Sequence, residues 1–386
     1  MGSVFFPDNY QWDLAANIAV NSKAPPGEVF WLARLLQDAS GTGDVDAWYD
    51  TWVGLAARAE SEAIAQEQRD ETIAAGERFR DASVYYQVGE RVLEFDDERK
   101  LGLFVQAVQC FERGLEYREP AGRLLEIPYE GATLRGYFLP AQGEVQGPAP
   151  CVVWFDGFDL SAEILAVRAE DLCRRGLHML VVDGPGYGWA LRVQQLATRY
   201  DYEAVATAVV DFLEGVGDVD ASRIGLAANS MGGYYAPRAA TFEKRIRACA
   251  AWGAMWDFHW YLSKQVAKGK ITVDDPSSAP YSQALKVFGV DSMDEALNLA
   301  EDFRLEPVIG DLTCSLLVVH GESDRQVPID HATRTIEAAG TEDKTLVVVP
   351  AGTPGEEHCQ WDNIVMAQHP IFDWLASRLA ADASSR

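Results

Sequence analysis

The chain has 386 residues, of which 48% are hydrophobic and 24% are charged, as in an ordinary globular protein. Its formal net charge is −26, from 59 acidic and 33 basic residues. Such a surface repels phosphate backbones and anionic lipids, so the composition argues against a nucleic acid or a membrane as partner.

The distribution of apolar residues and cysteines bears on the compartment. No apolar run approaches the ~20 residues of a membrane span, and the first residues lack the basic and apolar regions of a secretory signal. The 6 cysteines are scattered without a C-x-x-C pair, which predicts neither disulfides nor a zinc site. No glycine-rich phosphate-binding motif opens a helix. We therefore expect a cytoplasmic protein with no metal and no cofactor.

The first part of the chain has the apolar spacing of helices. Trp48, Trp52 and Leu55 recur at helical intervals, and residues 59–68 are good helix formers. We predict an N-terminal helical domain over residues 1–121, with its aromatic stripes in the core.

At Gly122 the periodicity changes from helix to strand. Residues 123–129 and 132–139 alternate about a Glu130-Gly131 turn, which predicts a hairpin. From Cys151 onward apolar strands alternate with helices, as in a mostly parallel sheet with helices on both faces. We expect strands at residues 151–155, 178–182, 223–227, 246–252, 315–320 and 345–349, and helices at 162–175 and 202–213. The second domain is predicted over residues 122–386.

One long interruption divides the later part of this pattern. Residues 255–312 follow the strand at 246–252 and include a helical stretch at 293–303. An insertion at that point would hang over the carboxyl ends of the strands, and we therefore predict a helical lid.

The motif around which the chemistry is organised is the stretch Ala-Asn-Ser-Met-Gly-Gly at residues 228–233. It follows an apolar strand and precedes a helix. This is a nucleophile elbow, G-x-S-x-G, with Ala228 in the first glycine position. The turn would raise the Ser230 hydroxyl above the sheet at a helix N-terminus, so we predict Ser230 as the nucleophile.

Two later loops supply the base and the acid that a serine nucleophile requires. The first loop contains Asp324, in the pattern Asp-x-x-Val-Pro, with Glu322 as a competing acid; the second contains His358. Both loops leave the carboxyl ends of predicted strands, and the order Ser230, Asp324, His358 is that of an α/β-hydrolase. The histidines expected to be structural are His178, His320, His331 and His369.

Acyl attack also creates an oxyanion, which needs two preorganised N–H donors. We predict the backbone N–H groups of Met231 and Phe158 as these donors, because Gly157 allows the Phe158 loop to approach closely. Four side chains beyond residue 252 are predicted to contact the substrate or, alternatively, only to anchor the lid: Trp256, Asp257, His259 and Tyr261. Their aromatic neighbours favour a flat substrate.

Together these features resemble the fermentation-respiration-switch-like branch of the α/β-hydrolase superfamily, which includes hydrolases of 2,6-dihydroxypseudooxynicotine and fungal polyketide-shortening hydrolases. The elbow, the Asp324 and His358 loops, the helical domain and the Asp-Gly-Phe-Asp sequence at 156–159 carry the resemblance. It implies hydrolysis of a carbon–carbon bond next to a ketone, a small aromatic or polyketide-like substrate, and a homodimer. The chain departs from the pattern at Ala228 and at Asp156, where many hydrolases carry His or Gly.

The sequence thus predicts a metal-free serine hydrolase that forms an acyl-enzyme. A carboxylesterase or lactonase would use the same residues, and so would an acyl-transfer or cyclising enzyme in which an internal nucleophile replaces water. A non-catalytic scaffold is a further alternative, which the presence of all three triad residues disfavours.

Overall fold

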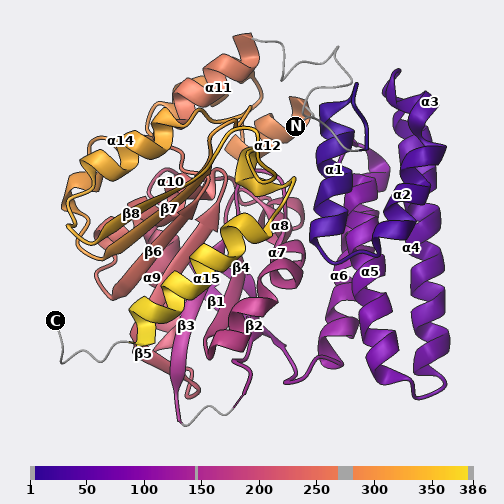
Figure 1. Ribbon diagram of the computed structural model, residues 1–386, viewed down its shortest axis with the longest axis horizontal. Helices are drawn as coiled ribbons and strands as arrows, with labels where there is room; N and C mark the ends of the chain where they lie inside the picture. Colours follow the sequence, from indigo (N-terminus) through magenta and orange to yellow (C-terminus); the bar gives the residue numbers. More distant parts are fainter. Residues whose placement is uncertain (1–4, 144–146, 268–280, 381–386) are drawn as a thin grey trace. The chain divides into compact units, whose positions relative to one another are not determined.

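The computed structural model describes residues 5–143, 147–267 and 281–380. The chain divides into two compact units. The first comprises Met1–Arg123, Glu163–Arg168 and Lys264–Lys286, and the second comprises Leu124–Ala162, Ala169–Ser263 and Val287–Arg386. The first is helical and the second carries the sheet (Figure 1). The boundary that the sequence places after residue 121 stays a prediction.

The long N-terminal segment of the first unit forms helices throughout. They are α1 (Tyr10–Asn21), α2 (Pro26–Leu35), α3 (Gln37–Ser40), α4 (Val45–Glu67), α5 (Thr72–Glu90) and α6 (Glu98–Glu116). Three of these helices have an N-cap side chain: those of Asn9, Asp44 and Asp97 accept backbone N–H groups in the first turns of α1, α4 and α6.

The aromatic stripe predicted from the sequence forms the core of this unit. Trp12 and Trp48 lie 4.7 Å apart between ring centroids, Trp48 and Trp52 lie 5.3 Å apart, and Trp52 and Tyr85 lie 5.9 Å apart. All four side chains are buried. The Trp48 indole N–H also donates to the carbonyl of Val88 at 2.9 Å, which satisfies its polar edge.

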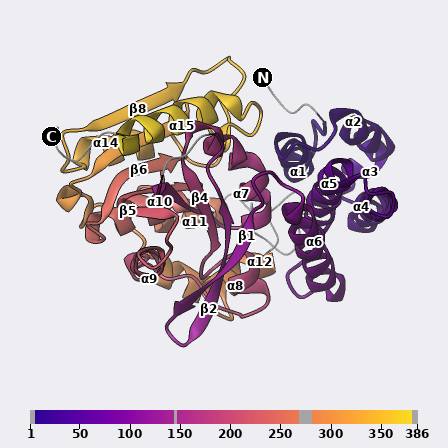
Figure 2. The ribbon, with the colours of Figure 1, turned by 90° about the horizontal axis from the view of Figure 1, so that it is seen from below.

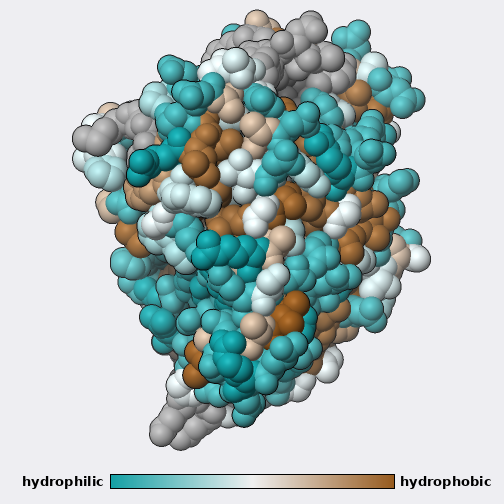
Figure 3. Space-filling view, turned by 90° about the vertical axis from the view of Figure 1, so that its right-hand side faces the viewer, coloured by the Kyte–Doolittle hydropathy of each residue, from teal (hydrophilic) through white to brown (hydrophobic). Residues whose placement is uncertain are grey.

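The surface of the same unit is not uniformly polar. Phe30, Trp31 and Leu35 of α2 are 50%, 51% and 57% exposed. Figure 3 shows hydrophobic residues between hydrophilic ones on the face that it presents. The homodimer that the resemblance implies stays a prediction.

The second unit is built on an eight-stranded sheet of order β1-β2-β4-β3-β5-β6-β7-β8. The strands are β1 (Arg123–Tyr129), β2 (Ala132–Leu139), β3 (Ala149–Phe155), β4 (His178–Asp183), β5 (Val219–Asn229), β6 (Ile246–Trp252), β7 (Ser315–Gly321) and β8 (Lys344–Val349). β2 pairs antiparallel with β4, whereas β4, β3, β5, β6, β7 and β8 pair in parallel. The predicted strands and the predicted mostly parallel sheet are confirmed.

Helices cover both faces of this sheet (Figures 1 and 2). On one face Phe372 of α15 (Val365–Ala380) packs edge-on against Trp154, with ring centroids 5.9 Å apart. On the other face lie α9 (Glu203–Leu213) and α10 (Gly232–Phe242), which contact each other as well as β5. Two further helices of this unit are α8 (Gly188–Arg192) and α14 (Asp330–Ala338). No helix in the described ranges is both long and apolar enough to cross a membrane.

Two helix predictions need correction. The helix expected at 162–175 is α7 (Ala162–Ala169) followed by a 3₁₀ segment, η1 (Glu170–Arg175), which ends at Gly176 with φ of +74°. The last turns tighten there because the left-handed glycine closes the segment. The helix expected at 293–303 is α13 and ends at Ala300.

The interruption at 255–312 contains four short elements. They are α11 (Phe258–Ala267), α12 (Tyr281–Phe288), α13 (Met293–Ala300) and η2 (Ile309–Asp311). Residues 268–280 lie outside the described residues, and the lid itself stays a prediction.

Candidate active site

The nucleophile elbow forms where β5 passes into α10. Ser230 lies between the last residue of β5, Asn229, and the first residue of α10, Gly232, and has φ of +60°. A non-glycine residue in this region is strained, and here the turn is held by a hydrogen bond from the Ser230 N–H to the carbonyl of Trp252 at 2.9 Å. Ser230 as a whole is half-buried.

Small residues around the elbow are required by close backbone contacts. A Cβ on Gly232 would lie 2.7 Å from the Cβ of Ala228, and a Cβ on Gly233 would lie 2.2 Å from the carbonyl oxygen of Gly253. Ala228 is therefore accommodated in the first glycine position because Gly232 has no side chain.

Three side chains form a hydrogen-bonded relay that starts at this serine. His358 Nε2 lies 2.9 Å from Ser230 Oγ, and His358 Nδ1 lies 2.7 Å from Asp324 Oδ2. The imidazole is buried, as is the carboxylate. The three residues follow β5, β7 and β8 at the carboxyl ends of these strands, as the sequence predicts. A serine, a base and an orienting acid at these distances can carry out nucleophilic acyl chemistry.

The structure distinguishes the two competing acids. Asp324 Oδ1 accepts the backbone N–H groups of Gln326 and Val327, each at 2.8 Å, while Oδ2 faces His358. Glu322 is exposed and accepts the N–H of Ala351 at 2.8 Å instead. Asp324 thus fixes its own loop and the imidazole together.

The pKa values of Asp324 and His358 move in opposite directions, as expected of a carboxylate that faces an imidazole. Burial alone would raise the pKa of Asp324, but the charge of His358 and its hydrogen bond hold it below the ordinary value. Burial alone would lower the pKa of His358, but Asp324 raises it well above the ordinary value. At neutral pH Asp324 is therefore ionised, and its negative charge faces His358 Nδ1.

The histidine loop is tied to β6 through contacts that sequence reasoning missed. The loop includes η3 (His358–Gln360), in which Cys359 and Gln360 have φ of +48° and +51°. The Trp252 indole N–H donates to Gln360 Oε1 at 2.7 Å, and the Cys359 thiol lies 3.4 Å from the Trp252 carbonyl. Trp252 thereby contacts both the nucleophile turn and the base loop.

The loop that follows β3 packs directly on the elbow. A Cβ on Gly157 would lie 2.9 Å from the Met231 nitrogen and 2.9 Å from Ser230 Cβ, so only glycine permits this approach. The N–H groups of Met231 and Phe158 remain predicted oxyanion donors. Sequence reasoning noted Asp156 as a departure but missed its hydrogen bond with Asn229.

The four side chains predicted to contact substrate lie at the start of α11 and have different partners. Asp257 Oδ1 accepts the Trp260 N–H at 2.8 Å, and its Oδ2 pairs with Arg304 at 3.5 Å. His259 lies 3.4 Å from the Ser263 hydroxyl. The Trp256 N–H donates to His331 Nδ1 at 3.1 Å.

Tyr261 contacts the Asp324 loop directly and the Phe158 loop through Phe258. Its ring packs on Phe258 with centroids 5.3 Å apart, and Phe258 in turn stacks at 6.3 Å on Phe158. Its hydroxyl donates to Gln326 Oε1 at 3.4 Å, two residues from Asp324. Aromatic side chains at the beginning of α11 therefore connect the Phe158 loop, which is the predicted oxyanion loop, with the Asp324 loop, which is the acid loop.

The histidines expected to be structural make local contacts or lie at the surface. His178 accepts the Ala141 N–H at 2.9 Å, and His320 Nε2 donates to the Val327 carbonyl at 2.8 Å. His331 Nδ1 accepts the Trp256 N–H, and His369 is exposed. Within the described residues, no group of three or more His, Cys, Asp or Glu side chains is placed to hold a metal ion.

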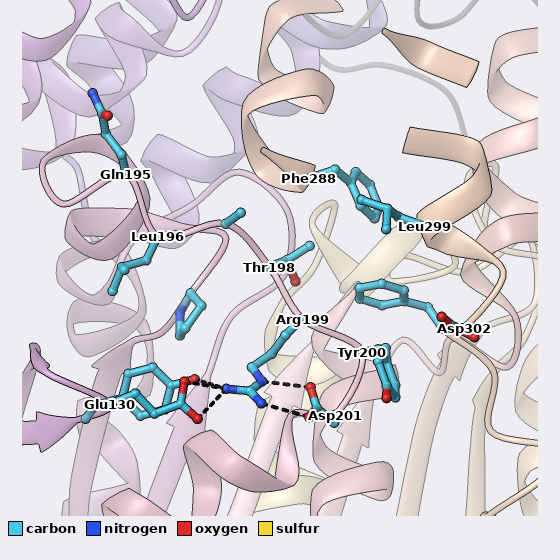
Figure 4. Close-up of a pocket in the computed structure, with 14 residues that line it drawn as sticks. Glu130, Gln195, Leu196, Thr198, Arg199, Tyr200, Asp201, Phe288, Leu299 and Asp302 are labelled. Carbon is cyan, nitrogen blue, oxygen red and sulfur yellow. Dashed lines mark hydrogen bonds and ion pairs between the residues drawn. The ribbon is translucent and has the colours of Figure 1, made fainter. Parts of the chain in front are cut away.

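A separate hollow of about 430 Å³ opens beside the loop at 195–201. Figure 4 shows Arg199 between Glu130 and Asp201, with which it forms ion pairs at 2.8 and 2.7 Å. Phe288 and Phe303 form part of the wall, and both pack against Phe258.

Two family models match this chain over more than half of its length. The family model described as "Esterase FrsA-like" matches residues 32–273, and that of the prolyl oligopeptidase family matches residues 165–382. The 2,6-dihydropseudooxynicotine hydrolase of Paenarthrobacter nicotinovorans is 27% identical over 368 residues, covering 92% of this chain and 94% of that protein.

A fungal relative and a solved structure extend the likeness over nearly the whole chain. The 20-hydroxy-prefusarin hydrolase FUS2 of Gibberella moniliformis is 27% identical, covering 92% of this chain and 93% of its own. The crystal structure of a 2,6-dihydroxy-pseudo-oxynicotine hydrolase superposes with a TM-score of 0.79 at 24% identity, covering 94% of this chain and 95% of the other. This chain is an α/β-hydrolase and belongs to the FrsA-like esterase family.

Proposed function

We propose that this protein is a serine hydrolase that cleaves a carbon–carbon bond next to a ketone in a small aromatic or polyketide-like compound. The observation that carries the proposal is the relay from Asp324 through His358 to Ser230, with hydrogen-bond distances of 2.7 and 2.9 Å. The names of two relatives that match nearly the whole chain, hydrolases of 2,6-dihydropseudooxynicotine and 20-hydroxy-prefusarin, support a small-molecule substrate.

The proposed reaction begins with proton transfer. His358 Nε2 takes the Ser230 proton as the serine oxygen attacks the ketone carbon, and the imidazolium is stabilised by ionised Asp324. The oxyanion accepts hydrogen bonds from the Met231 and Phe158 N–H groups. When the tetrahedral intermediate collapses, the carbon–carbon bond breaks and the departing carbon takes a proton. Water activated by His358 then hydrolyses the acyl-serine, which releases the acid and restores the enzyme.

Carbon–carbon cleavage requires a proton donor at the departing carbon, because the leaving group is a carbanion equivalent. The His358 imidazolium holds the proton taken from Ser230 and can transfer it to the departing carbon. Tyr261 is our candidate for orienting the substrate, because its ring belongs to the aromatic group beside Phe158 and its hydroxyl lies near the acid loop.

Ester hydrolysis is the second candidate, since the matching family model describes an esterase. An ester leaving group needs protonation at oxygen only, so the same relay suffices.

The test compares wild type with Ser230→Ala on aryl β-diketones, acyl phenols and p-nitrophenyl esters, with products identified by mass spectrometry. Ser230-dependent cleavage of the diketones at carbon, with acyl-serine detected by intact mass, supports the proposal. Rapid Ser230-dependent turnover of esters alone would select the esterase function. A fluorophosphonate that fails to label Ser230 in folded protein would reject both.

A further inference from the structure

A buried carboxylate lies directly before the predicted oxyanion loop. Asp156 is 1% exposed, and its Oδ1 accepts two hydrogen bonds, from the Gly157 N–H at 2.7 Å and from the Asn229 side-chain amide. Gly157 belongs to the oxyanion loop, whereas Asn229 is the residue before Ser230. A single oxygen atom therefore joins two segments that are 73 residues apart in the chain.

The hydrogen-bonded chain continues into the sheet. Asn229 Oδ1 accepts the Trp154 indole N–H at 3.1 Å, and Trp154 lies on β3, two residues before Asp156. Because the indole donates to Oδ1, the amide nitrogen of Asn229 is directed at Asp156. This orientation depends on side chains from β3 and β5, which are buried and neighbouring strands.

The two segments joined in this way touch without any side chain between them. A Cβ on Gly157 would lie 2.9 Å from the Asn229 carbonyl oxygen, and a Cβ on Gly232 would lie 2.8 Å from the Asp156 carbonyl oxygen. Van der Waals contact sets how near the loop can come, but it does not fix the sideways position of the loop. Directional hydrogen bonds do so, and a buried carboxylate is tolerated only where such bonds satisfy it.

We propose that Asp156 and Asn229 are positioning residues that set the separation of the two predicted oxyanion donors, the N–H groups of Phe158 and Met231. Phe158 follows Gly157, whose N–H donates to Asp156. Met231 lies two residues after Asn229. Oxyanion stabilisation depends on donors preset at hydrogen-bond distance from the developing charge. The inference rests on the proposed function, because the pair acts only through Ser230 chemistry.

The test uses isosteric changes at Asp156. Asp156→Asn keeps an oxygen that can accept from Gly157 and Asn229, whereas Asp156→Leu keeps the shape and removes the acceptor. We expect kcat for p-nitrophenyl acetate to fall about 10- to 100-fold in Asp156→Leu, below the 10²- to 10³-fold loss typical of a deleted donor. KM should change less than about threefold, and Asp156→Asn should stay within about fivefold of wild-type kcat, by the same reasoning.

Asn229→Ala removes the Asp156–Asn229 hydrogen bond by deleting its donor, and it replaces Asp156→Leu in the test if that variant does not fold. The double variant Asp156→Leu/Asn229→Ala should be no slower than the slower single variant, because both remove one shared bond. The matched control is Asp343→Leu, which removes a carboxylate that accepts the Ser315 hydroxyl at 2.6 Å at the opposite end of β7. It should lower the melting temperature and leave kcat within about twofold.

The outcomes separate this inference from the proposed function. Wild-type kcat in both Asp156→Leu and Asn229→Ala would overturn it, as would an Asp156→Asn variant as slow as Asp156→Leu, or losses that multiply in the double variant. Fluorophosphonate labelling of Ser230 in the wild type is measured alongside. A wild type that is neither labelled nor active overturns the proposed function, and the inference falls with it.

Discussion

The close contact between the predicted oxyanion loop and the elbow gives a sharp prediction for Gly157→Ala. The added Cβ would lie 2.9 Å from the Asn229 oxygen, from Ser230 Cβ and from the Met231 nitrogen. An ordinary contact between such atoms is about 3.5 Å, so the loop has to retreat by roughly half an ångström. The opposing atoms belong to the strained nucleophile turn, which cannot yield without moving Ser230.

The retreat should reduce catalysis more than stability. A loop displaced by this amount takes the Phe158 N–H out of the range of about 2.7–3.1 Å in which an oxyanion donor is effective. We expect kcat to fall about 10- to 100-fold, part of the loss on deleting a donor. Overpacking should also lower the free energy of unfolding by about 1–3 kcal/mol.

Gly136→Ala is the matched control. Its Cβ would lie 2.9 Å from Leu180 Cδ1 and 3.2 Å from Val182 Cγ2, a clash on β2, away from the relay, with side-chain atoms that yield more easily than the backbone facing Gly157. It should lower the melting temperature, followed by tryptophan fluorescence, without changing kcat for p-nitrophenyl acetate. If Gly157→Ala lost the same stability as Gly136→Ala and kept kcat within about twofold of wild type, the oxyanion reasoning would be refuted.

Two further predictions concern protonation. Asp324→Asn should lower kcat about 10⁴-fold. It should also move the rising limb of the kcat/KM profile to lower pH, because the charge that raises the pKa of His358 is removed while burial still lowers that pKa. A pH–rate profile checks this, and a rising limb at the wild-type pH would contradict it. Burial lowers the pKa of His331 from 6.5 to about 4, so its contribution to stability is full above pH 6.5 and is lost as the pH falls toward 4. Over that interval the wild type should lose about 3 kcal/mol relative to His331→Asn, as measured by urea unfolding at pH 7 and pH 4; parallel curves for the two proteins would contradict it.

The strands and the order of the relay could be predicted because they depend on local patterns. Apolar runs of five to seven residues between helical segments define a parallel sheet. Parallel strands bring their carboxyl ends to one edge, so loops containing Ser230, Asp324 and His358 were expected to meet. The distances of 2.9 and 2.7 Å then depend on the packing of those loops, which no single segment encodes.

The features that sequence reasoning missed are contacts between segments far apart in the chain. Asp156 and Asn229 are 73 residues apart, and Trp252 and Gln360 are 108 apart. Their pairing follows from strand register, since Trp252 lies opposite Asn229 in the sheet. Asp257 was predicted to contact the substrate or only to anchor the lid; its hydrogen bond with the Trp260 N–H, three residues on, is a local contact, and its role stays a prediction.

The strand order explains why chemistry and substrate choice can be separated in this fold. Ser230, the proposed nucleophile, follows β5; of the two neighbouring strands, β3 precedes the predicted oxyanion loop and β6 supplies the carbonyl that accepts the Ser230 N–H. β7 and β8 lie two and three strands from β5, about 10 and 14 Å away, so the loop after β8 has to reach back across β7 to place the base. Of these strands, β3, β6 and β7 are buried over all or nearly all of their length. The start of α11, in contrast, contacts the predicted oxyanion loop through Phe258 and the Asp324 loop through Tyr261. We expect substitutions there to alter substrate preference while the distances in the relay are preserved.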